Sequence, residues 1–547
     1  MRTTLLALAA LLASTSALAD TLIDNANGIQ VDKDGKLDRF TGLIVGDDGR
    51  VVRLIRAGEE VKRDFTQRVD AGGRTLLPGL IDAHGHVMGL GFTAMQLDLT
   101  GTASIADLQA RLKDYAAANP DARWVLGRGW NQENWANKHY PTSADLDAVV
   151  SDRPVWLTRV DGHAAIANSA ALRAAGIAPG TSSPEGGRIE NGLFVDAAMG
   201  LVESKIPAPA PAEQDAALAV AQELMLANGL SATADMGTSF DDWWTIRRAG
   251  DAGQLNVRIL AYAGGYQSMW RIEEGKQSDW KYGERLRLIG VKLYADGALG
   301  SRGAFLKAPY HDKPDTRGLS LIDDMELLKQ AEAVASHGYQ AAIHAIGDAA
   351  NSQVIATYER LAKEYPGDQR WRIEHVQVID PADIPRLKST GIIASMQPIH
   401  QTSDRLMAEA RLGPDRLEGA YAWQTIARSG VTLAFGSDFP VESPNPFPAL
   451  GAAISRQDMN GEPPGGWLPQ ERVSFEQALA AFTRGAAYAS FAEDKIGSLE
   501  PGKWADFIIV DRDVSQADPQ ALARTKVLET WVAGKKVWTS ADAMRDR

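Results

Sequence analysis

Eight short apolar runs, separated by stretches that are mostly helical in pattern, constrain the fold more than any other feature of this sequence. The runs are apolar for most of their length rather than alternating, which is typical of parallel strands buried on both faces. Strands that alternate with helical patterns predict βαβ units and a parallel sheet. The eight runs are residues 77–81, 231–236, 258–263, 289–295, 340–344, 371–375, 392–397 and 432–436. They favour an α/β fold with a closed (β/α)8 barrel of the TIM type, and an open doubly wound sheet is the alternative.

The stretch between the first two runs, from about residue 88 to residue 229, is too long for a single helix. We therefore expect an insertion with its own structure, at about residues 90–228, over one end of the barrel. The barrel itself is expected to span residues 76–490.

Both ends of the chain have the sequence pattern of short strands joined by tight turns. The sequence DDGR at residues 47–50 predicts a turn between two apolar runs, and residues 497–503 form a turn-rich segment ahead of the apolar run 506–510. We expect the two ends, residues 20–75 and 491–547, to pair into one small β-sandwich domain. Two unrelated hairpins are the alternative.

Residues 1–19 predict export and are not expected to belong to the fold. Arg2 precedes an apolar run at residues 5–12, and the sequence ALA at residues 17–19 has the small-x-small pattern of a signal-peptide cleavage site. A membrane anchor is the alternative, but the run is too short to span a bilayer. We therefore expect the mature protein in the periplasm or the medium, with no membrane span.

Two features of the composition limit the metal ligands and the partners that this chain can use. The chain has no cysteine, so disulfides and thiolate ligands are excluded, and any metal must bind His, Asp, Glu or a Lys-derived group. The net charge of −13 disfavours nucleic acid as a partner, because phosphate binding needs a basic surface. We expect a small-molecule substrate, and a homodimer is compatible with such a sequence.

Chemically active side chains gather at five of the predicted strands, and barrel enzymes place their catalytic groups at the C-terminal ends of strands. These side chains are His84, His86, Lys292, His344, His375 and Asp438. His84 and His86 are two residues apart, so their side chains share one face of a strand and suit a single ion. Each residue alone is explained by packing, as an interior histidine or a turn aspartate. Together they favour a metal site, because burying such groups unpaired costs roughly several kcal/mol.

Six segments occur in a characteristic order along nearly the whole mature chain. They read LPGLIDAHGH at residues 77–86, VKLYADGALGSR at 291–302, HAIGD at 344–348, RIEH at 372–375, GSDFPV at 436–441 and GSLEPGKWAD at 497–506. This set resembles the amidohydrolase superfamily, and more narrowly the YtcJ-like group called amidohydrolase family 3, which includes N-substituted formamide deformylases.

The resemblance implies a ligand set for one or two divalent ions. Carried over residue by residue, it is His84, His86, Lys292, His344, His375 and Asp438. Lys292 matches a position where many relatives carry a carboxylated lysine that bridges two ions, and the alternative is an unmodified lysine beside Asp296 with one ion. Zinc is the metal expected first, and manganese, iron, cobalt and nickel also suit nitrogen and oxygen ligands.

The function implied by the resemblance is hydrolysis of a non-peptide C–N bond, of the amide or formamide type, by metal-activated water. Asp438 has the expected acid–base role. An esterase, a lactonase or a phosphoester hydrolase on the same metal centre is the alternative among enzymes. A non-catalytic exported binding protein is the alternative from another class, and the complete ligand pattern argues against it.

A second group of residues is predicted to bind the substrate. It comprises Arg128, Trp130, Asp161 and His163 in the insertion and Arg302 after the fourth barrel strand. Arg302 suits a carboxylate or a carbonyl group. The alternatives are a core position for Trp130, a surface ion pair for Asp161 and a satisfied loop histidine at His163.

Overall fold

The computed structural model describes residues 20–541, apart from residues 160, 161, 163, 179, 185, 186, 197, 274 and 275 and the side chains of Glu133 and Asp196. The predicted signal peptide lies outside the described residues. The chain divides into two compact units, one made of the residues up to His86 together with those from Glu223 onward, the other Val87–Gln222. Within the described chain, no helix combines the length and the apolar character needed to cross a membrane.

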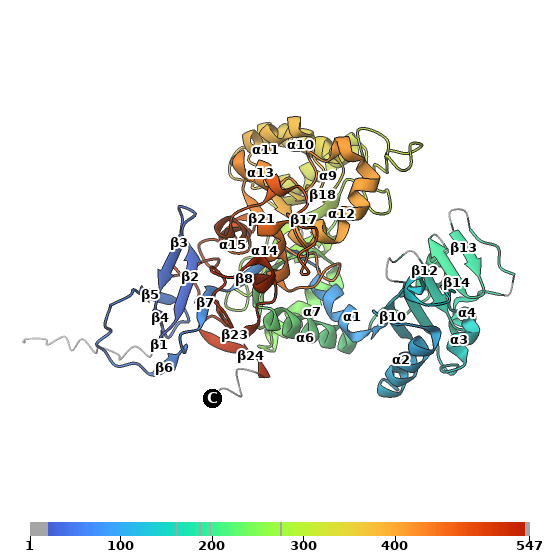
Figure 1. The fold of residues 1–547 in the computed structure, drawn as a ribbon, viewed down its shortest axis with the longest axis horizontal. Coiled ribbons are helices and arrows are strands. Elements are labelled where there is room, and N and C mark those ends of the chain that lie inside the picture. The colour runs from blue at the N-terminus through green and yellow to red at the C-terminus, as the bar shows by residue number, and fades with distance from the viewer. Residues whose placement is uncertain are drawn as a thin grey trace, which may run out of the picture. The chain divides into compact units, whose positions relative to one another are not determined.

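The first unit contains an eight-stranded, wholly parallel sheet (Figure 1). Its strands in spatial order are β8 (Leu80–Gly85), β15 (Leu230–Thr238), β16 (Arg258–Gly264), β17 (Leu286–Tyr294), β18 (Gln340–Ala345), β19 (Arg372–His375), β20 (Ile393–Met396) and β21 (Leu433–Phe435). Two backbone hydrogen bonds join the last strand to the first: Asp438 N donates to His84 O at 2.7 Å, and His86 N donates to Phe439 O at 2.8 Å. The predicted TIM-type barrel is confirmed.

The first predicted strand, residues 77–81, is wrong in its boundaries. The chain forms two strands there, β7 (Thr75–Pro78) and β8, which belong to different sheets. Gly79 separates them, and a Cβ at this position would lie 2.2 Å from Ser231 Oγ. Glycine therefore allows the close approach with which the chain passes from one sheet to the other.

Helices fill the connections between barrel strands. Those before β21 are α6 (Pro211–Ala227), α7 (Phe240–Asp251), α8 (Tyr266–Arg271), α9 (Asp324–Ser336), α10 (Asp348–Glu364), α11 (Ile384–Thr390), α12 (Pro398–Leu412) and α13 (Trp423–Arg428), and those after it are α14 (Pro446–Ser455), α15 (Phe475–Ala481) and α16 (Arg484–Ala489). Side-chain caps define several starts: Ser239 and Asp242 form a capping box at α7, and Asp323 accepts from Glu326 N at α9.

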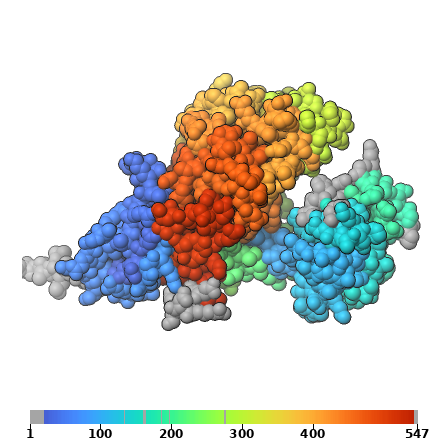
Figure 2. All heavy atoms as spheres, viewed as in Figure 1, coloured from blue at the N-terminus to red at the C-terminus, as the bar shows by residue number. Residues whose placement is uncertain are grey.

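The two chain ends combine into a β-sandwich in the same unit. A six-stranded sheet has the order β24 (Lys535–Thr539), β23 (Val527–Val532), β22 (Phe507–Val510), β7, β2 (Asn27–Val31) and β3 (Leu37–Phe40), and a four-stranded sheet has the order β5 (Val51–Ile55), β4 (Gly42–Val45), β1 (Thr21–Asp24) and β6 (Gln67–Asp70). Both sheets contribute to one apolar core, which includes Ile23, Leu43, Phe507 and Trp531. Figure 2 shows the N-terminal residues in blue against the C-terminal residues in red.

The second unit is the insertion that follows β8. Its six-stranded sheet has the order β13 (Gly187–Glu190), β14 (Leu193–Asp196), β12 (Ala164–Ala167), β11 (Val155–Arg159), β10 (Val125–Trp130) and β9 (Leu97–Asp98). The helices of this unit are α1 (Val87–Met95), α2 (Ile105–Ala118), α3 (Ser143–Asp147), α4 (Ser169–Ala175) and α5 (Gly200–Glu203). Leu108, Leu112, Val125, Leu157 and Ile166 are fully buried in its core, so the insertion has an apolar core of its own.

Candidate metal centre

The predicted ligands meet because they come from the C-terminal ends of barrel strands. Asp82 and His84 in β8, and His86 just beyond it, alternate in sequence and so point to the same face. The other predicted ligands are Lys292 on β17, His344 on β18, His375 at the end of β19 and Asp438 three residues after β21. His375 and Asp438 have φ angles of 78° and 61°. A positive φ is energetically unfavourable for residues other than glycine, and such positions cluster at functional sites.

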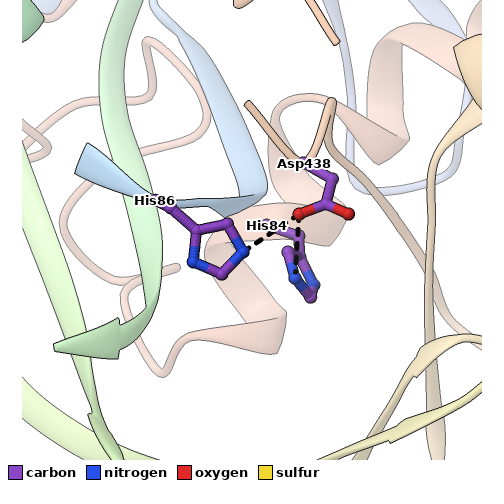
Figure 3. Close-up of side chains that lie close together, drawn as sticks. All are labelled: His84, His86 and Asp438. Atoms are coloured by element: carbon purple, nitrogen blue, oxygen red, sulfur yellow. Dashed lines mark hydrogen bonds and ion pairs between the residues drawn. The ribbon is translucent and has the colours of Figure 1, made fainter. Parts of the chain in front are cut away.

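His84, His86 and Asp438 form the first cluster of ligand atoms (Figure 3). Asp438 Oδ1 lies 3.0 Å from His86 Nε2 and 3.5 Å from His84 Nε2. Nδ1 of His84 faces the other way and contacts Glu374 Oε2 at 2.6 Å. A proton on Nδ1 completes this hydrogen bond, so the lone pair of Nε2 faces the cluster.

Lys292 closes one side of this cluster. Its Nζ lies 3.1 Å from His84 Nε2, and the side chain is buried. Burial lowers the pKa of Lys292 to about 8. Asp296, the partner in the alternative with an unmodified lysine, uses its carboxylate to accept backbone hydrogen bonds from Phe305, Ile346 and Gly347 at 2.8–2.9 Å.

The ring of His375 connects this cluster to two further histidines, His344 and His400. The ring centroid of His375 lies 4.7 Å from that of His84 and 4.6 Å from that of His344. His375 Nδ1 contacts Gln397 Oε1 at 2.8 Å, which leaves its Nε2 for a ligand. The ligand atoms of His375, His400 and Asp438 also lie within 4.8 Å of one another.

Burial sets the protonation states of these groups. Burial, and then the charge of Lys292, lowers the pKa of His84 to about 4 and that of His344 to about 3. Burial also lowers the pKa of His375 well below its usual value. Burial raises the pKa of Asp438, but His84 and the hydrogen bond with His86 outweigh it and hold this pKa well below the usual range. Near neutral pH, His84, His344 and His375 are therefore neutral imidazoles and Asp438 is a carboxylate, the forms that bind a cation.

The donor set fits a divalent metal ion. His344 Nε2 and His400 Nε2 are buried and have no hydrogen-bond partner among the described residues. Leaving such a nitrogen without a partner costs about 1–3 kcal/mol, which a cation would offset. Imidazole nitrogens with carboxylate oxygen, and no thiolate, suit zinc and other divalent transition metals.

The predicted substrate-binding residues are placed differently from the predicted ligands. Trp130 is buried in the core of the insertion, where Nε1 donates to Leu157 O at 2.8 Å. Arg128 is exposed on β10 of the same unit. Arg302 pairs with both carboxylate oxygens of Asp312, at 3.1 Å and 2.8 Å. Asp161 and His163 lie outside the described residues. The substrate role of all five stays a prediction.

Two residues at the centre were not predicted. Glu374 was part of a recognised motif but was not assigned a contact to His84, because sequence spacing does not show which strand-end groups meet. His400 follows β20 by four residues, in the first turn of α12. A histidine after the seventh predicted strand was the available signal, of the same kind as those at the other strands.

Comparison with known proteins agrees with this geometry. Residues 67–538 match the model of the Amidohydrolase family. The chain is similar to the putative amidohydrolase YtcJ of Bacillus subtilis (strain 168), at 31% identity over 92% of this chain and 96% of that protein. It is also similar to N-substituted formamide deformylase of Arthrobacter pascens, at 26% identity over 94% of this chain and 98% of that protein. A solved structure of an uncharacterized metal-dependent hydrolase from Pyrococcus horikoshii covers 91% of this chain and 99% of its own, with 27% identity and a TM-score of 0.78. The chain therefore belongs to the amidohydrolase family, in the YtcJ-like group called family 3, and is a metal-dependent hydrolase.

Proposed function

We propose that this hydrolase cleaves a non-peptide C–N bond of the amide or formamide type, with water activated by one or two divalent cations, zinc first among them. The observation that carries the proposal is Asp438, an ionised carboxylate held 3.0 Å from His86 Nε2 and clustered with the neutral imidazoles of His84 and His375. The similarity to N-substituted formamide deformylase over 94% of the chain supports the choice of bond.

The chain's own residues hold the cation and the reacting groups in place. His84, His86, His344, His375 and Asp438 supply the ligand atoms, and Lys292 supplies a further one if it is carboxylated. A divalent cation in such a site contributes Lewis acidity, which lowers the pKa of water from about 15.7 toward ~7 and polarises a carbonyl group.

Asp438 moves the proton that the reaction requires. Its carboxylate accepts a proton as water adds to the carbonyl carbon, and it then donates that proton to the leaving nitrogen as the C–N bond breaks. The products are a carboxylic acid, which is formic acid for a formamide, and an amine. An amine leaving group depends on this proton more than the alkoxide of an activated ester does.

Carboxylation of Lys292 is part of the proposal. With a pKa of about 8, a fraction of the amine is neutral at pH 7–8 and can add to carbon dioxide, forming an N–C bond and releasing one proton. The carbamate would offer two anionic oxygens as further ligands for the cation site. Labelled bicarbonate and carbon NMR of the metal-loaded enzyme test this step, and the signal should disappear in Lys292→Ala.

Export is proposed from the signal sequence. Cleavage after Ala19 would make Asp20 the first residue of the mature hydrolase. N-terminal sequencing of protein from the periplasm or the medium tests this. An intact N-terminus on protein found in the cytoplasm would contradict it.

The first prediction tests the reaction itself. N-formyl amines, N-acyl amino acids, hydantoin-like rings and aryl esters are offered to the metal-loaded enzyme and to Asp438→Asn. We expect amide or formamide turnover, lost on chelation and restored by metal, and a decrease of about 10²–10⁴-fold in kcat/KM in the variant. The decrease should be smaller for activated esters. Turnover of esters alone, or equal losses for both substrate types, would retract the proposal.

A further inference from the structure

Arg372 is a buried cation that lies behind the predicted ligand His84. It is the first residue of β19, and its side chain is completely buried. Nε and Nη2 of Arg372 donate to the two carboxylate oxygens of Glu374 at 2.7 Å and 3.1 Å. Glu374 Oε2 in turn lies 2.6 Å from Nδ1 of His84, whose Nε2 faces the cluster. The direction of this Nε2 therefore depends on the position of a guanidinium group inside the barrel.

Tyr262 holds another edge of the same guanidinium group. Nη1 of Arg372 donates to Tyr262 Oη at 3.0 Å. Tyr262 Oη donates to Gln340 Oε1 at 2.5 Å, and Gln340 Nε2 donates to Ala489 O, at the end of α16, at 2.9 Å. The side chains of Arg372, Tyr262 and Gln340 are almost completely buried. These hydrogen bonds form one continuous chain from α16 to the metal ligand.

The sequence provides the space that this chain needs. Tyr262 is on β16 and Arg372 is on β19, which are not neighbours in the sheet, so the two side chains meet inside the barrel. Tyr262 pairs with Gly290 on β17, where an added Cβ would lie 2.4 Å from the tyrosine ring. Gln340 is the first residue of β18, whereas His344 lies near its other end. The hydrogen bonds therefore link the metal centre to the opposite end of the strands.

Stability alone does not account for a charged chain in this place. Large branched apolar side chains usually fill the interior of such a barrel. A buried ion pair loses much of its attraction to desolvation, and apolar residues of similar volume are often at least as stable. The chain ends on a ligating histidine, however, and hydrogen-bond partners behind such a histidine fix its ring and raise the basicity of its ligand atom. Its position therefore indicates a role in metal binding.

We propose that Tyr262 is a positioning residue for the metal centre. It acts on His84 through Arg372 and Glu374. Its hydroxyl accepts from Arg372 and donates to Gln340, so both of its hydrogen-bonding functions fix the guanidinium group. A fixed guanidinium keeps Glu374 aligned with His84 Nδ1, and Nε2 then keeps the direction in which it binds a cation. The inference rests on the cation site of the proposed function and does not depend on which bond is cleaved.

Metal affinity measured without substrate tests this role. Each mature chain is stripped of metal and then titrated with zinc in competition with a chromophoric chelator. Tyr262→Phe keeps the ring and removes the hydroxyl. The matched control is Tyr358→Phe, because Tyr358 is equally buried and its hydroxyl donates to the backbone oxygens of Arg372 at 2.8 Å and Ala341 at 3.0 Å. Both variants lose a buried hydroxyl beside Arg372, but of the two tyrosines only Tyr262 contacts the guanidinium group through its hydroxyl.

We expect the zinc affinity to fall about 3–10-fold in Tyr262→Phe and less than about twofold in Tyr358→Phe, although both variants should melt at a lower temperature. Combined with Glu374→Gln, Tyr262→Phe should have no further effect, because the anion through which it acts is absent. The visible absorption of the cobalt-loaded chain reports the ligand geometry, and it should change in Tyr262→Phe but not in Tyr358→Phe. Gln340→Met removes the acceptor of the Tyr262 hydroxyl and is the second variant if Tyr262→Phe does not fold. Its zinc affinity should fall as well.

Three results would overturn the proposal. They are an unchanged zinc affinity in a folded Tyr262→Phe or Gln340→Met, equal losses in the two tyrosine variants, or a loss in Tyr262→Phe that is the same with and without the Glu374 carboxylate. Each of them leaves the proposed hydrolysis untouched, since the natural chain still binds zinc. A natural chain that binds no zinc would instead retract the proposed function, and the positioning role with it.

Discussion

Buried charge behind the histidines determines the direction in which the ligand atoms point. Glu374 accepts from Arg372 Nε at 2.7 Å and contacts His84 Nδ1 at 2.6 Å, and all three side chains are almost completely buried. Burial raises the pKa of Glu374, but Arg372 and His84 outweigh it and hold the carboxyl ionised. The anion fixes the ring of His84 and increases the basicity of its Nε2.

Replacing Glu374 by glutamine should therefore weaken metal binding. The amide keeps the shape of the side chain but removes the negative charge, so His84 loses the anion that fixes its ring and increases the basicity of its Nε2. We expect a decrease in metal affinity of about 10–100-fold, measured by competition with a chromophoric chelator. Glu359→Gln is the control, because Glu359 forms a similar fork with Arg386 at the surface. Equal affinities for the two variants would show that the charge of Glu374 does not act on the metal.

At the scale of single residues, the sequence predicted the candidate ligands at strand ends. It did not predict the hydrogen bonds that orient those ligands. His84, His344 and His375 were predicted because strand ends of a barrel converge, which is a property of the fold. The pairing of Glu374 with His84 joins residues 290 positions apart and depends on the register between strands. His400 was missed because it belongs to a helix, where distance from the strand end is a weaker guide.

The closure of the barrel and the formation of the centre depend on the same few bonds. Asp82 on β8 accepts hydrogen bonds from Ser437 N at 3.0 Å and from Ser437 Oγ at 2.6 Å, next to Asp438. Gly436 allows this contact, since a Cβ there would lie 2.5 Å from Asp82 Oδ1 and 2.6 Å from His84 N. The position of Asp438 is thus set by the junction between the first and last strands.

Gly436→Ala should disrupt this junction. The methyl group meets backbone and a buried carboxylate, neither of which can move freely, so β21 is expected to separate from β8. We expect a loss of about 1–3 kcal/mol in the free energy of unfolding, as for other overpacked sites, together with weaker metal binding. Urea denaturation measures the first effect. Gly200→Ala, where the added Cβ meets nothing within 4 Å, is the control, and matching losses in both variants would contradict the junction model.

A surface carboxylate in the composite β-domain should give a pH-dependent stability. Burial raises the pKa of Glu500, but hydrogen bonds from Lys503 and Arg484 outweigh it and lower this pKa from 4.5 to about 2. The unfolded chain therefore binds the proton first, so the stabilisation is present above about pH 4.5 and is lost as the pH falls toward 2. The side chain is 39% exposed, which limits the effect to about 0.2–1 kcal/mol.

Thermal unfolding of Glu500→Gln at several pH values measures this contribution. The variant should melt below the natural chain at pH 7, and the difference should shrink as the pH is lowered from 4.5 to 3. Glu60→Gln is the control, since the pair of Glu60 with Lys62 is more than three-quarters exposed, and its difference should be small at every pH. A constant difference for Glu500→Gln would rule out the carboxylate as the cause.

Strand boundaries were the least predictable part of the elements. The apolar run at residues 77–81 contains the end of β7 and the start of β8, and hydrophobicity does not change where the chain moves between sheets. Only the contacts of Gly79 with Ser231 in β15 distinguish the two strands, and these join residues 152 positions apart. The remaining barrel strands were found because each is a single apolar run between helices.

For the whole molecule, the chain joins two compact units, each with an apolar core of its own. The barrel is tied to the sandwich of the two chain ends by a buried ion pair, in which Arg258 on β16 donates to Asp506 at 2.7 Å and 2.9 Å. The insertion, Val87–Gln222, is a separate compact unit with its own core. Units with separate cores are expected to unfold as separate cooperative steps.

Removing the metal should therefore destabilise only one of the two units and shift only its unfolding transition. All the candidate ligands lie in the unit that contains the barrel, so a cation stabilises its folded state. Among the described residues of the insertion there is no such group of ligands. A cation at 1,000 times its Kd adds about 4.1 kcal/mol to that unit. Differential scanning calorimetry with and without chelator should show two transitions, of which one moves to lower temperature. The isolated insertion, expressed as residues 87–222, identifies the transition that does not move. A single transition that shifts as a whole would mean that the units unfold together, and two unmoved transitions would mean that the cluster holds no cation.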